Sequence, residues 1–353
     1  MFKLKTIKLK LLIFCLIISI LFCNNLFFVN AETIYPSGMS LEDDSDIVFE
    51  NAVGWGNITN LPSIVDLTEN FPTPQQQIGE SCTGWTIGYA LKSYQEFNKR
   101  QWTKNTENHI FNPYYIYNKV NGGSNIPVSL KKALKQLETS GACPSTYYSL
   151  TDSTIRPATS LENAAASLYK VNDIQNVYSV SNMKNYLYNG HAVVLGIRIA
   201  PDFRNINNTN DTYDDKSNLE NVGHSICLIG YDDQKGAFKF INSWGTKWGL
   251  DGYGWISYDL VNDPFVNYYY LEKGFVIVEN VEYDYILGDV NNDKIITAAD
   301  SRLVLRFSSK LESFTDKQQV LADVDGNGIV EAADSRHIMR YSSGLISQFP
   351  LYD

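Results

Sequence analysis

The hydrophobic pattern changes period once along the central part of this chain, and that change limits the folds it can adopt. Apolar residues recur at helical spacing over 82–100 and again over 128–137, ahead of Gly141. From about residue 168 the apolar residues instead form short runs between turns, at 192–199, 225–231, 237–242, 253–258 and 269–278. Helices first and strands later indicate an α+β domain with a helical half and an antiparallel β half.

The N-terminal residues 1–31 have the plan of a secretory signal. Four lysines precede a mostly apolar run over 11–28, and small residues precede Glu32. The run is nearly long enough to span a bilayer, so a retained anchor is the alternative; once the signal is cleaved, we expect no membrane association. Residues 32–60 are acidic and weakly patterned, which predicts a flexible leader or a short pro-segment.

Charge excludes one class of partner. The formal net charge is −10, and it becomes −14 when the signal leaves with its four lysines and no acidic residue. A chain this acidic lacks the basic surface that nucleic acid requires, so we exclude nucleic-acid binding. We expect part of the negative charge to serve metal sites.

Three cysteines remain after the signal, at positions 82, 143 and 227. An odd number in a secreted chain leaves at least one free thiol, which is either inert and buried or kept for chemistry. A bridge between Cys143 and Cys227 would leave Cys82 free, but the sequence does not establish that pairing.

Three short segments supply, in chain order, the groups of a nucleophilic site. Cys82 begins the first helical pattern, His224 begins an apolar strand, and Asn242 ends the next strand, eighteen residues after the histidine. A cysteine nucleophile needs a neighbouring base, and the base needs a third group that fixes its ring. A helix N-terminus and an imidazolium would both lower the pKa of the thiol. A lone cysteine or histidine is more often structural, but the combination favours a catalytic cleft between the two halves.

These segments resemble the papain family of cysteine peptidases, over about residues 61–281. The resemblance rests on a glutamine ahead of Ser81-Cys82, on the strand 224–231, and on a tryptophan–glycine block made of Asn242-Ser243-Trp244-Gly245, Trp248-Gly249 and Gly252-Tyr253. It implies a papain-like fold of two subdomains, an acyl-enzyme mechanism without a cofactor, and protein or peptide substrates. Cys82 would be the nucleophile, His224 the general acid and base, and Asn242 the group that orients the ring.

The resemblance also implies an oxyanion hole and a substrate-binding surface. The backbone N–H of Cys82 and the side chain of Gln76 would form the oxyanion hole, because Gln76 stands six residues before the cysteine; Gln75 and Gln77 adjoin it and leave the choice open. Gly122-Gly123 would bind substrate through its backbone, although two glycines are also an ordinary turn. Trp244 would shield the His224–Asn242 hydrogen bond beside the substrate.

The chain departs from the family pattern at two places near the cysteine. Thr83-Gly84-Trp85 replaces the usual Trp-Ala-Phe, and Gly79 stands where a disulfide-forming cysteine is usual. No long helical inhibitory propeptide fits between the signal and residue 61. We therefore expect that a short leader keeps the peptidase inactive, or that nothing does. His109, His191 and His337 match no catalytic position, and we interpret them as structural.

The C-terminal part of the chain contains one unit twice. Residues 287–306 and 321–340 align at an offset of 34 residues, and both contain Ala-Ala-Asp-Ser-Arg. Each copy has oxygen ligands at the spacing of a twelve-residue calcium loop. The first set is Asp289, Asn291, Asp293, the carbonyl of Ile295, Thr297 and Asp300. The second set is Asp323, Asp325, Asn327, the carbonyl of Ile329, Glu331 and Asp334. Two complete sets predict two structural Ca²⁺ ions rather than two solvated surface turns.

A loop followed by one helix, twice, at 301–311 and 335–345, resembles the type I dockerin module. That resemblance implies docking to a cohesin module of a scaffoldin, with Ala298-Ala299 and Ala332-Ala333 at the positions that select the partner. Lys294 stands where the sixth loop position is usually glycine, as Gly328 is, so the first site is expected to be the weaker.

The sequence thus predicts a secreted cysteine endopeptidase held on a cellulosome-type complex outside the cell. The predicted parts are a signal at 1–31, a leader at 32–60, a peptidase domain at 61–281, a linker at 282–286 and a dockerin at 287–353. Two alternatives stay open: the same thiol chemistry directed at cell-wall peptides, and a binder without catalysis.

Overall fold

The computed structural model describes residues 35–42, 44–52, 60–206, 211–267, 274–278 and 285–352. The chain divides into two compact units, Met1–Tyr35 and Pro36–Asp353, and all that follows concerns the second. The predicted signal at 1–31 lies outside the described residues. Among the helices of the described ranges, none is long and apolar enough to cross a membrane.

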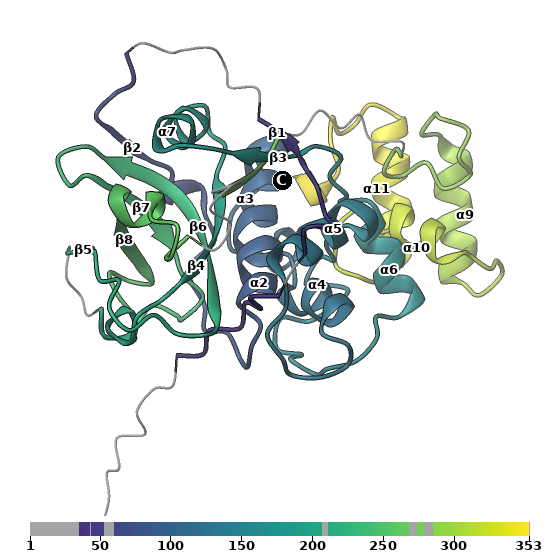
Figure 1. Cartoon of the computed structure of the whole chain (residues 1–353). Helices are drawn as coiled ribbons and strands as arrows, with labels where there is room; N and C mark the ends of the chain where they lie inside the picture. The colour runs from purple at the N-terminus through teal and green to yellow at the C-terminus, as the bar shows by residue number, and fades with distance from the viewer. Residues whose placement is uncertain are drawn as a thin grey trace, which may run out of the picture. The chain divides into compact units, whose positions relative to one another are not determined.

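One continuous helical rod forms the centre of the helical half (Figure 1). It runs from Cys82 to Arg100 through α2 (Cys82–Gly84), the π-helical η2 (Trp85–Lys92) and α3 (Ser93–Arg100). Every residue from 82 to 94 is buried, because this segment packs on both the other helices and the sheet. The remaining elements of this half are η1 (Thr68–Asn70), η3 (Glu107–His109), α4 (Pro113–Val120), α5 (Leu130–Ser140) and α6 (Ser160–Ser167).

The second half is a mixed, mainly antiparallel sheet. In the described residues the strand order is β1-β3-β9-β4-β6-β7-β8-β5, and β2 also pairs with β6. The strands are β1 (Glu50–Asn51), β2 (Ile64–Asp66), β3 (Ile174–Val177), β4 (Val193–Arg198), β5 (Thr212–Tyr213), β6 (Gly223–Asp232), β7 (Ala237–Ile241), β8 (Tyr253–Ser257) and β9 (Gly274–Ile277). Helices α7 (Val180–Tyr188) and α8 (Tyr258–Asn262) and the turn η4 (Pro201–Asn205) accompany the sheet.

Strand β6 joins the two halves. Residues 223–231 of β6 are all buried, as expected for a central strand covered on both faces. The hydroxyl of Thr86, on the helical rod, donates to the carbonyl of Ser225 on β6 at 2.9 Å. The predicted α+β fold with a helical half and a β half is confirmed.

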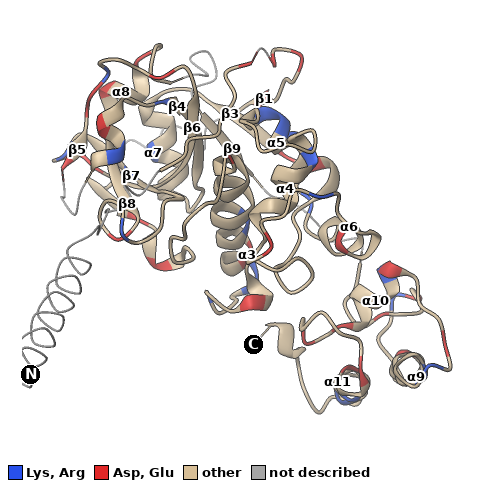
Figure 2. Ribbon diagram, turned by 90° about the horizontal axis from the view of Figure 1, so that it is seen from below, with Lys and Arg blue, Asp and Glu red and all other residues tan. Residues whose placement is uncertain are grey.

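The C-terminal repeats form a small helical part with internal symmetry. Its elements are α9 (Ala298–Ser308), α10 (Asp316–Ala322), α11 (Ala332–Ser342) and η5 (Pro350–Tyr352) (Figure 2). The hydroxyl of Ser301 donates to the carbonyl of Ser335 at 2.8 Å, and the hydroxyl of Ser335 donates to the carbonyl of Ser301 at 2.7 Å. This reciprocal pair lies where α9 and α11 meet, and it reflects the duplication directly.

Helices α9 and α11 begin three residues earlier than the ranges 301–311 and 335–345 predict. The cause is capping: the carboxylate of Asp300 accepts from the backbone N–H of Thr297 at 2.9 Å, and Asp334 does the same for Glu331 at 2.9 Å. The carboxylate at the twelfth loop position therefore also caps the N-terminus of the helix.

Helices α4, α6, α7 and α10 were not predicted. Two of them carry start signals that the sequence displays. Asn112 caps α4 and is followed by a proline at the first helical position, and Thr159 forms a capping box with Glu162 at the start of α6. Both helices are short and weakly amphipathic, so hydrophobic periodicity does not reveal them.

The helical rod contains a buried ion cluster. Lys92 Nζ lies 2.7 Å from Glu96 Oε1, and both side chains are fully buried. Arg100 Nε lies 2.5 Å from the other carboxylate oxygen. Burial alone would raise the pKa of Glu96, but the two cations lower it to about 2.

Replacing Glu96 with glutamine should destabilise the protein by about 3–5 kcal/mol, because it removes the negative charge that faces two buried cations. Urea unfolding measures the change. Glu138→Gln is the matched control, since its pair with Lys135 is partly exposed and should contribute about 1 kcal/mol or less. Equal, small effects of the two variants would contradict this account of the cluster.

Candidate active site

Cys82 lies at the first helical residue of the rod, as the sequence predicts, and is fully buried. Burial raises the pKa of its thiol to about 12, and the nearby Glu80 carboxylate adds to the shift. The backbone of Ser225, the residue after His224, acts in the opposite direction as a hydrogen-bond donor. The thiol of Cys82, in the helical half, therefore lies next to the backbone of Ser225, in the β half.

His224 and Asn242 come from adjacent strands. His224 is the second residue of β6, and Asn242 directly follows β7. His224 Nε2 lies 2.8 Å from Asn242 Oδ1, and both residues are buried. Asn242 Oδ1 also accepts from the backbone N–H of Ser243 at 2.8 Å, which fixes the amide. Because an amide oxygen only accepts, Nε2 carries the ring proton.

The second ring nitrogen of His224, Nδ1, is buried and makes no well-formed hydrogen bond among the described residues, although the backbone of Ser37 lies near enough to raise the pKa of the ring. With Nε2 protonated toward Asn242, a neutral ring presents Nδ1 as a proton acceptor. Burial lowers the pKa of His224 to about 4 in this covered state, against the raising effect of Asn242.

Trp244 shields the His224–Asn242 pair. Its ring is fully buried and stacks on the imidazole, with 4.6 Å between ring centroids and 30° between planes. Phe203 meets the imidazole edge-on at 5.9 Å. Excluding water strengthens the hydrogen bond that holds the ring.

Gln76 and Gln77 differ in burial and in hydrogen-bond partners. Gln76 is exposed, and its amide donates to the carbonyl of Gln77 at 3.3 Å. Gln77 is buried: its Oε1 accepts from the hydroxyl of Ser243 at 2.6 Å, which orients its Nε2 toward the carbonyl of Ser37 at 3.1 Å. Gln77 Nε2 also donates to the carbonyl of Gly79 at 2.9 Å, and the choice among the three glutamines stays a prediction.

A segment of the leader covers the site. The carbonyl of Pro36 accepts from Trp244 Nε1 at 2.7 Å, and the carbonyl of Ser37 accepts from Gln77. The Ser37 backbone also contributes to the environment of His224. The thiol and imidazole are fully buried in this arrangement.

The same segment, residues 36–41, is held by main-chain bonds to both halves. Met39 exchanges two hydrogen bonds with Gly223, of 2.9 and 2.8 Å, on the β half. On the helical half, Val128 donates to the carbonyl of Gly38 and accepts from the N–H of Ser40, both at 3.0 Å. Residues 36–41 thus bond to both halves, and the two predicted forms of the leader, flexible or a short pro-segment, stay open.

Gly122 and Gly123 lie outside this contact. Both are exposed and have positive φ values of 62° and 80°, in a turn closed by Asn121, whose side chain accepts from Gly123 N–H at 2.9 Å. The backbone that pairs with the leader strand is that of Val128 instead. The two glycines form an exposed turn, and their role in substrate binding stays a prediction.

The other cysteines and histidines have structural surroundings. Cys143 and Cys227 are both free and buried, so the bridge that the sequence left open does not form. His109 stacks on Trp102 with 4.6 Å between ring centroids. Burial lowers the pKa of His191.

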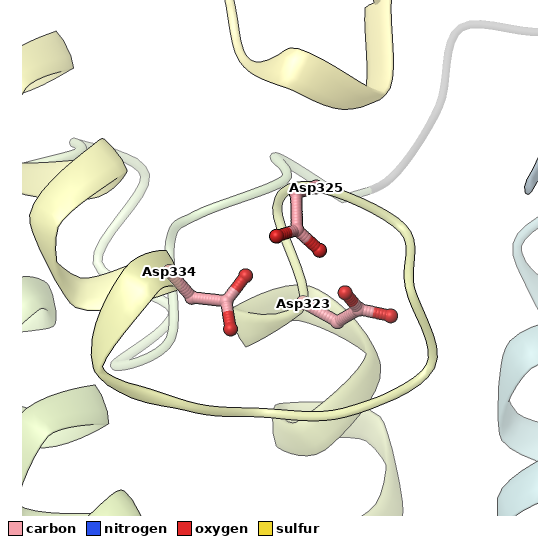
Figure 3. Close-up of side chains that lie close together, drawn as sticks. All are labelled: Asp323, Asp325 and Asp334. Atoms are coloured by element: carbon pink, nitrogen blue, oxygen red, sulfur yellow. The ribbon is translucent and has the colours of Figure 1, made fainter.

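In the second calcium loop, three carboxylates meet at one point (Figure 3). Ligand oxygens of Asp323, Asp325 and Asp334 all lie within 4.8 Å of one another. Burial, together with the neighbouring carboxylates, raises the pKa of Asp323 to about 6 and that of Asp334 to about 7. A divalent cation would relieve this repulsion, and carboxylate oxygens are the donors that calcium prefers. The residues present therefore fit calcium.

The first loop has the same internal bonding. Asp289 accepts from the N–H groups of Asp293 and Lys294, as Asp323 does from those of Asn327 and Gly328, at 2.8 to 3.1 Å. The carboxylates of the twelfth position, Asp300 and Asp334, are fully buried in both loops.

The remaining predicted ligands belong to the same two turns. Asn291 donates to Asp293 at 2.8 Å, and the side chains of Ile295 and Ile329 are exposed. Thr297 and Glu331 are the N-cap residues of α9 and α11. Lys294 adopts φ 73° where Gly328 has φ 84°, a backbone conformation that strains a lysine.

Comparison with known proteins agrees with both parts of the chain. A family model described as papain family cysteine protease matches residues 75–273, and one described as dockerin type I domain matches residues 287–341. Among solved structures, xylellain, a cysteine protease from Xylella fastidiosa, superposes with a TM-score of 0.60 at 20% identity, covering 71% of this chain and 97% of that one.

Curated relatives give the same result. An uncharacterised peptidase C1-like protein of Acanthamoeba polyphaga mimivirus is 24% identical over 67% of this chain and 80% of its own length. Cathepsin K of Gallus gallus is 49% identical over a short stretch, 12% of this chain and 13% of that protein. This chain belongs to the papain family of cysteine proteases, is a cysteine-type peptidase, and carries a type I dockerin domain at its C-terminal end.

Proposed function

We propose that the chain is a secreted endopeptidase whose thiol site consists of Cys82, His224 and Asn242. The observation that carries this proposal is the setting of the His224 ring. Asn242 holds the ring at Nε2, and Nδ1 makes no well-formed hydrogen bond among the described residues. Ser225, the next residue of the same strand, contacts Cys82. The family assignment supplies the reaction class, and protein is its substrate class.

In the proposed reaction, His224 takes the thiol proton and Cys82 attacks the scissile carbonyl carbon. The tetrahedral intermediate collapses when His224 gives that proton to the leaving amine, and an acyl-enzyme remains. His224 then takes a proton from water, whose oxygen attacks the thioester carbonyl. Collapse of the second intermediate releases the carboxyl product and returns the thiol.

We assign the oxyanion hole to the backbone N–H of Cys82 and the side chain of Gln77. The amide of Gln77 already binds a carbonyl oxygen, that of Ser37, and its direction is fixed by Ser243. A donor fixed in advance needs no reorganisation when charge develops on the substrate oxygen.

We propose further that the leader is a short pro-segment. Residues 36–41 cover the thiol and the imidazole with bonds that any backbone can make. In this state the pKa values of Cys82 and His224 favour two neutral groups, and removal of the segment would return water to both. Cleavage of the chain between this segment and residue 61 would free the site.

The dockerin domain supports attachment to an extracellular scaffold. We propose that both loops bind calcium through the two ligand sets and that the paired faces around Ala298-Ala299 and Ala332-Ala333 bind a cohesin. The proposed parts are the signal at 1–31, pro-segment at 32–60, peptidase domain at 61–281, linker at 282–286 and dockerin at 287–353.

Cys82→Ala should abolish casein cleavage by the leader-trimmed protein, because the nucleophile is lost. Cys143→Ala and Cys227→Ala are matched controls: both remove free, buried thiols and should leave cleavage within about threefold of the parent. Trimmed protein that labels at Cys82 but cleaves only cell-wall peptides would favour the alternative substrate. Peptide binding without any cleavage would favour the binder.

Gly38→Ala should loosen the pro-segment and speed alkylation of Cys82 by iodoacetamide at least about fivefold. Gly38 has φ 109°, and a Cβ there would collide with the backbone of Glu80. Strain of about 1–3 kcal/mol would raise the fraction of molecules in which the pro-segment has left Cys82. Peptide mapping by mass spectrometry measures the rate at Cys82. Gly236→Ala is the control, because it has φ 61° but open space around the new methyl group. Unchanged labelling of Gly38→Ala would refute the covering role.

Binding to a type I cohesin should require calcium. Surface plasmon resonance should detect binding in millimolar Ca²⁺ and at least a hundredfold loss after chelation, since the buried carboxylates repel one another without the ion. The Cys82→Ala variant should bind normally. Equal binding with and without chelator would contradict the dockerin assignment.

A further inference from the structure

The peptidase and the dockerin share an interface that includes the second of the two loops. The hydroxyl of Tyr147, in the helical half, donates to Oδ2 of Asp323 at 2.6 Å. The side chain of Asn108 donates to the carbonyl of Asp325 at 3.2 Å. Both acceptors belong to residues of the second calcium loop. Within the described residues, these hydrogen bonds from the peptidase reach ligand residues of the second loop and not those of the first, and this difference needs an explanation.

The C-terminal residues extend this interface. The carbonyl of Leu351 lies 2.8 Å from His109 Nε2, and Leu351 is itself nearly buried. Arg100, at the end of the helical rod, donates to the hydroxyls of Tyr285 at 3.1 Å and Tyr352 at 3.4 Å. These contacts involve buried or half-buried groups with specific partners, as in a packed interface rather than a loose encounter.

Two glycines allow the second loop to approach the peptidase so closely. A Cβ at Gly328 would lie 2.9 Å from the carbonyl oxygen of Thr146, and one at Gly326 would lie 3.4 Å from Cβ of Asn108 and closer still to Leu351. The first loop carries Asn292 and Lys294 at the corresponding positions, with φ values of 59° and 73°. The first loop therefore tolerates side chains there, but could not occupy the same surface.

We propose that calcium in the second loop controls the docking of the dockerin on the helical half of its own peptidase. The inference rests on the proposed calcium binding. Asp323 and Asp325 take part in both the ligand set and the interface, so an ion that fixes the loop also fixes the surface presented to Tyr147 and Asn108. Without the ion, three clustered carboxylates repel and the loop loses that shape.

The coupling is reciprocal. If calcium strengthens docking by some factor, docking strengthens calcium binding at the second loop by the same factor. A hydrogen bond from Tyr147 to the oxygen of a ligand carboxylate is the kind of outer contact that changes metal affinity by about 10- to 100-fold. We therefore expect the two loops to differ in calcium affinity for two reasons: the contact of the second loop with the peptidase, and the backbone strain at Lys294 in the first loop.

Hydrogen exchange of the full chain, followed by mass spectrometry of peptides over 103–110 and 144–149, tests the proposal. Chelation should raise exchange in both peptides at least tenfold. Asp334→Asn, which weakens the second loop without altering a peptidase contact, should do the same in limiting calcium, whereas Asp300→Asn, its counterpart in the first loop, should not. Equal responses of the two variants would overturn the assignment to the second loop.

A second variant separates docking from folding of the loop. Gly326→Asn combined with Gly328→Lys gives the second loop the residues of the first, which that loop already accommodates. Calorimetry should still find two calcium ions, while exchange at 103–110 and 144–149 rises as after chelation. Two ions with unchanged exchange would overturn the proposal. No bound calcium in the parent protein would instead overturn the calcium assignment on which it rests.

Discussion

The contact between the start of the helical rod and strand β6 is the constraint on which the rest of the site depends. Thr86, one helical turn after Cys82, donates a hydrogen bond to the carbonyl of Ser225 on β6. His224, the residue before Ser225, bonds to Asn242 at the end of the neighbouring strand β7. Because the rod and β6 are among the most completely buried elements, small shifts there are costly. The core of the domain thus sets the positions of the thiol, the ring and the amide, and we expect these positions to persist when the proposed pro-segment is removed.

The parts of the site that the sequence predicts are those tied to regular elements. Cys82 begins a helix whose apolar spacing is evident, and Asn242 ends a strand one hairpin after His224. The choice among three glutamines is different, since successive residues of an extended segment point to opposite sides. Gln76 pairs with Trp244 through its backbone and is exposed, whereas Gln77 is buried, and this difference is the basis on which we propose Gln77. Spacing from the cysteine carries no information on that alternation.

The covering segment escapes sequence analysis for a related reason. It is held mainly by main-chain hydrogen bonds, which any non-proline sequence can make, and its anchoring side chains are few: Met39 is fully buried, but it stands in an acidic and aperiodic stretch. The short helices α4 and α6 were missed although their caps are visible in the sequence, because eight residues carry too little periodicity. In the repeats, the duplication predicts the calcium ligands, whereas the interface of the second loop depends on the peptidase surface that it meets.

The central claim is that His224 activates Cys82 once the covering segment is removed. The direct measurement is the pH dependence of Cys82 alkylation by iodoacetamide in the trimmed protein and in its His224→Gln variant. The parent should show a thiol pKa below about 7, as expected for a thiolate beside an imidazolium at a helix start. The variant should show a value near or above ~8.5, the ordinary range of a cysteine. Identical profiles for the two proteins would contradict the account.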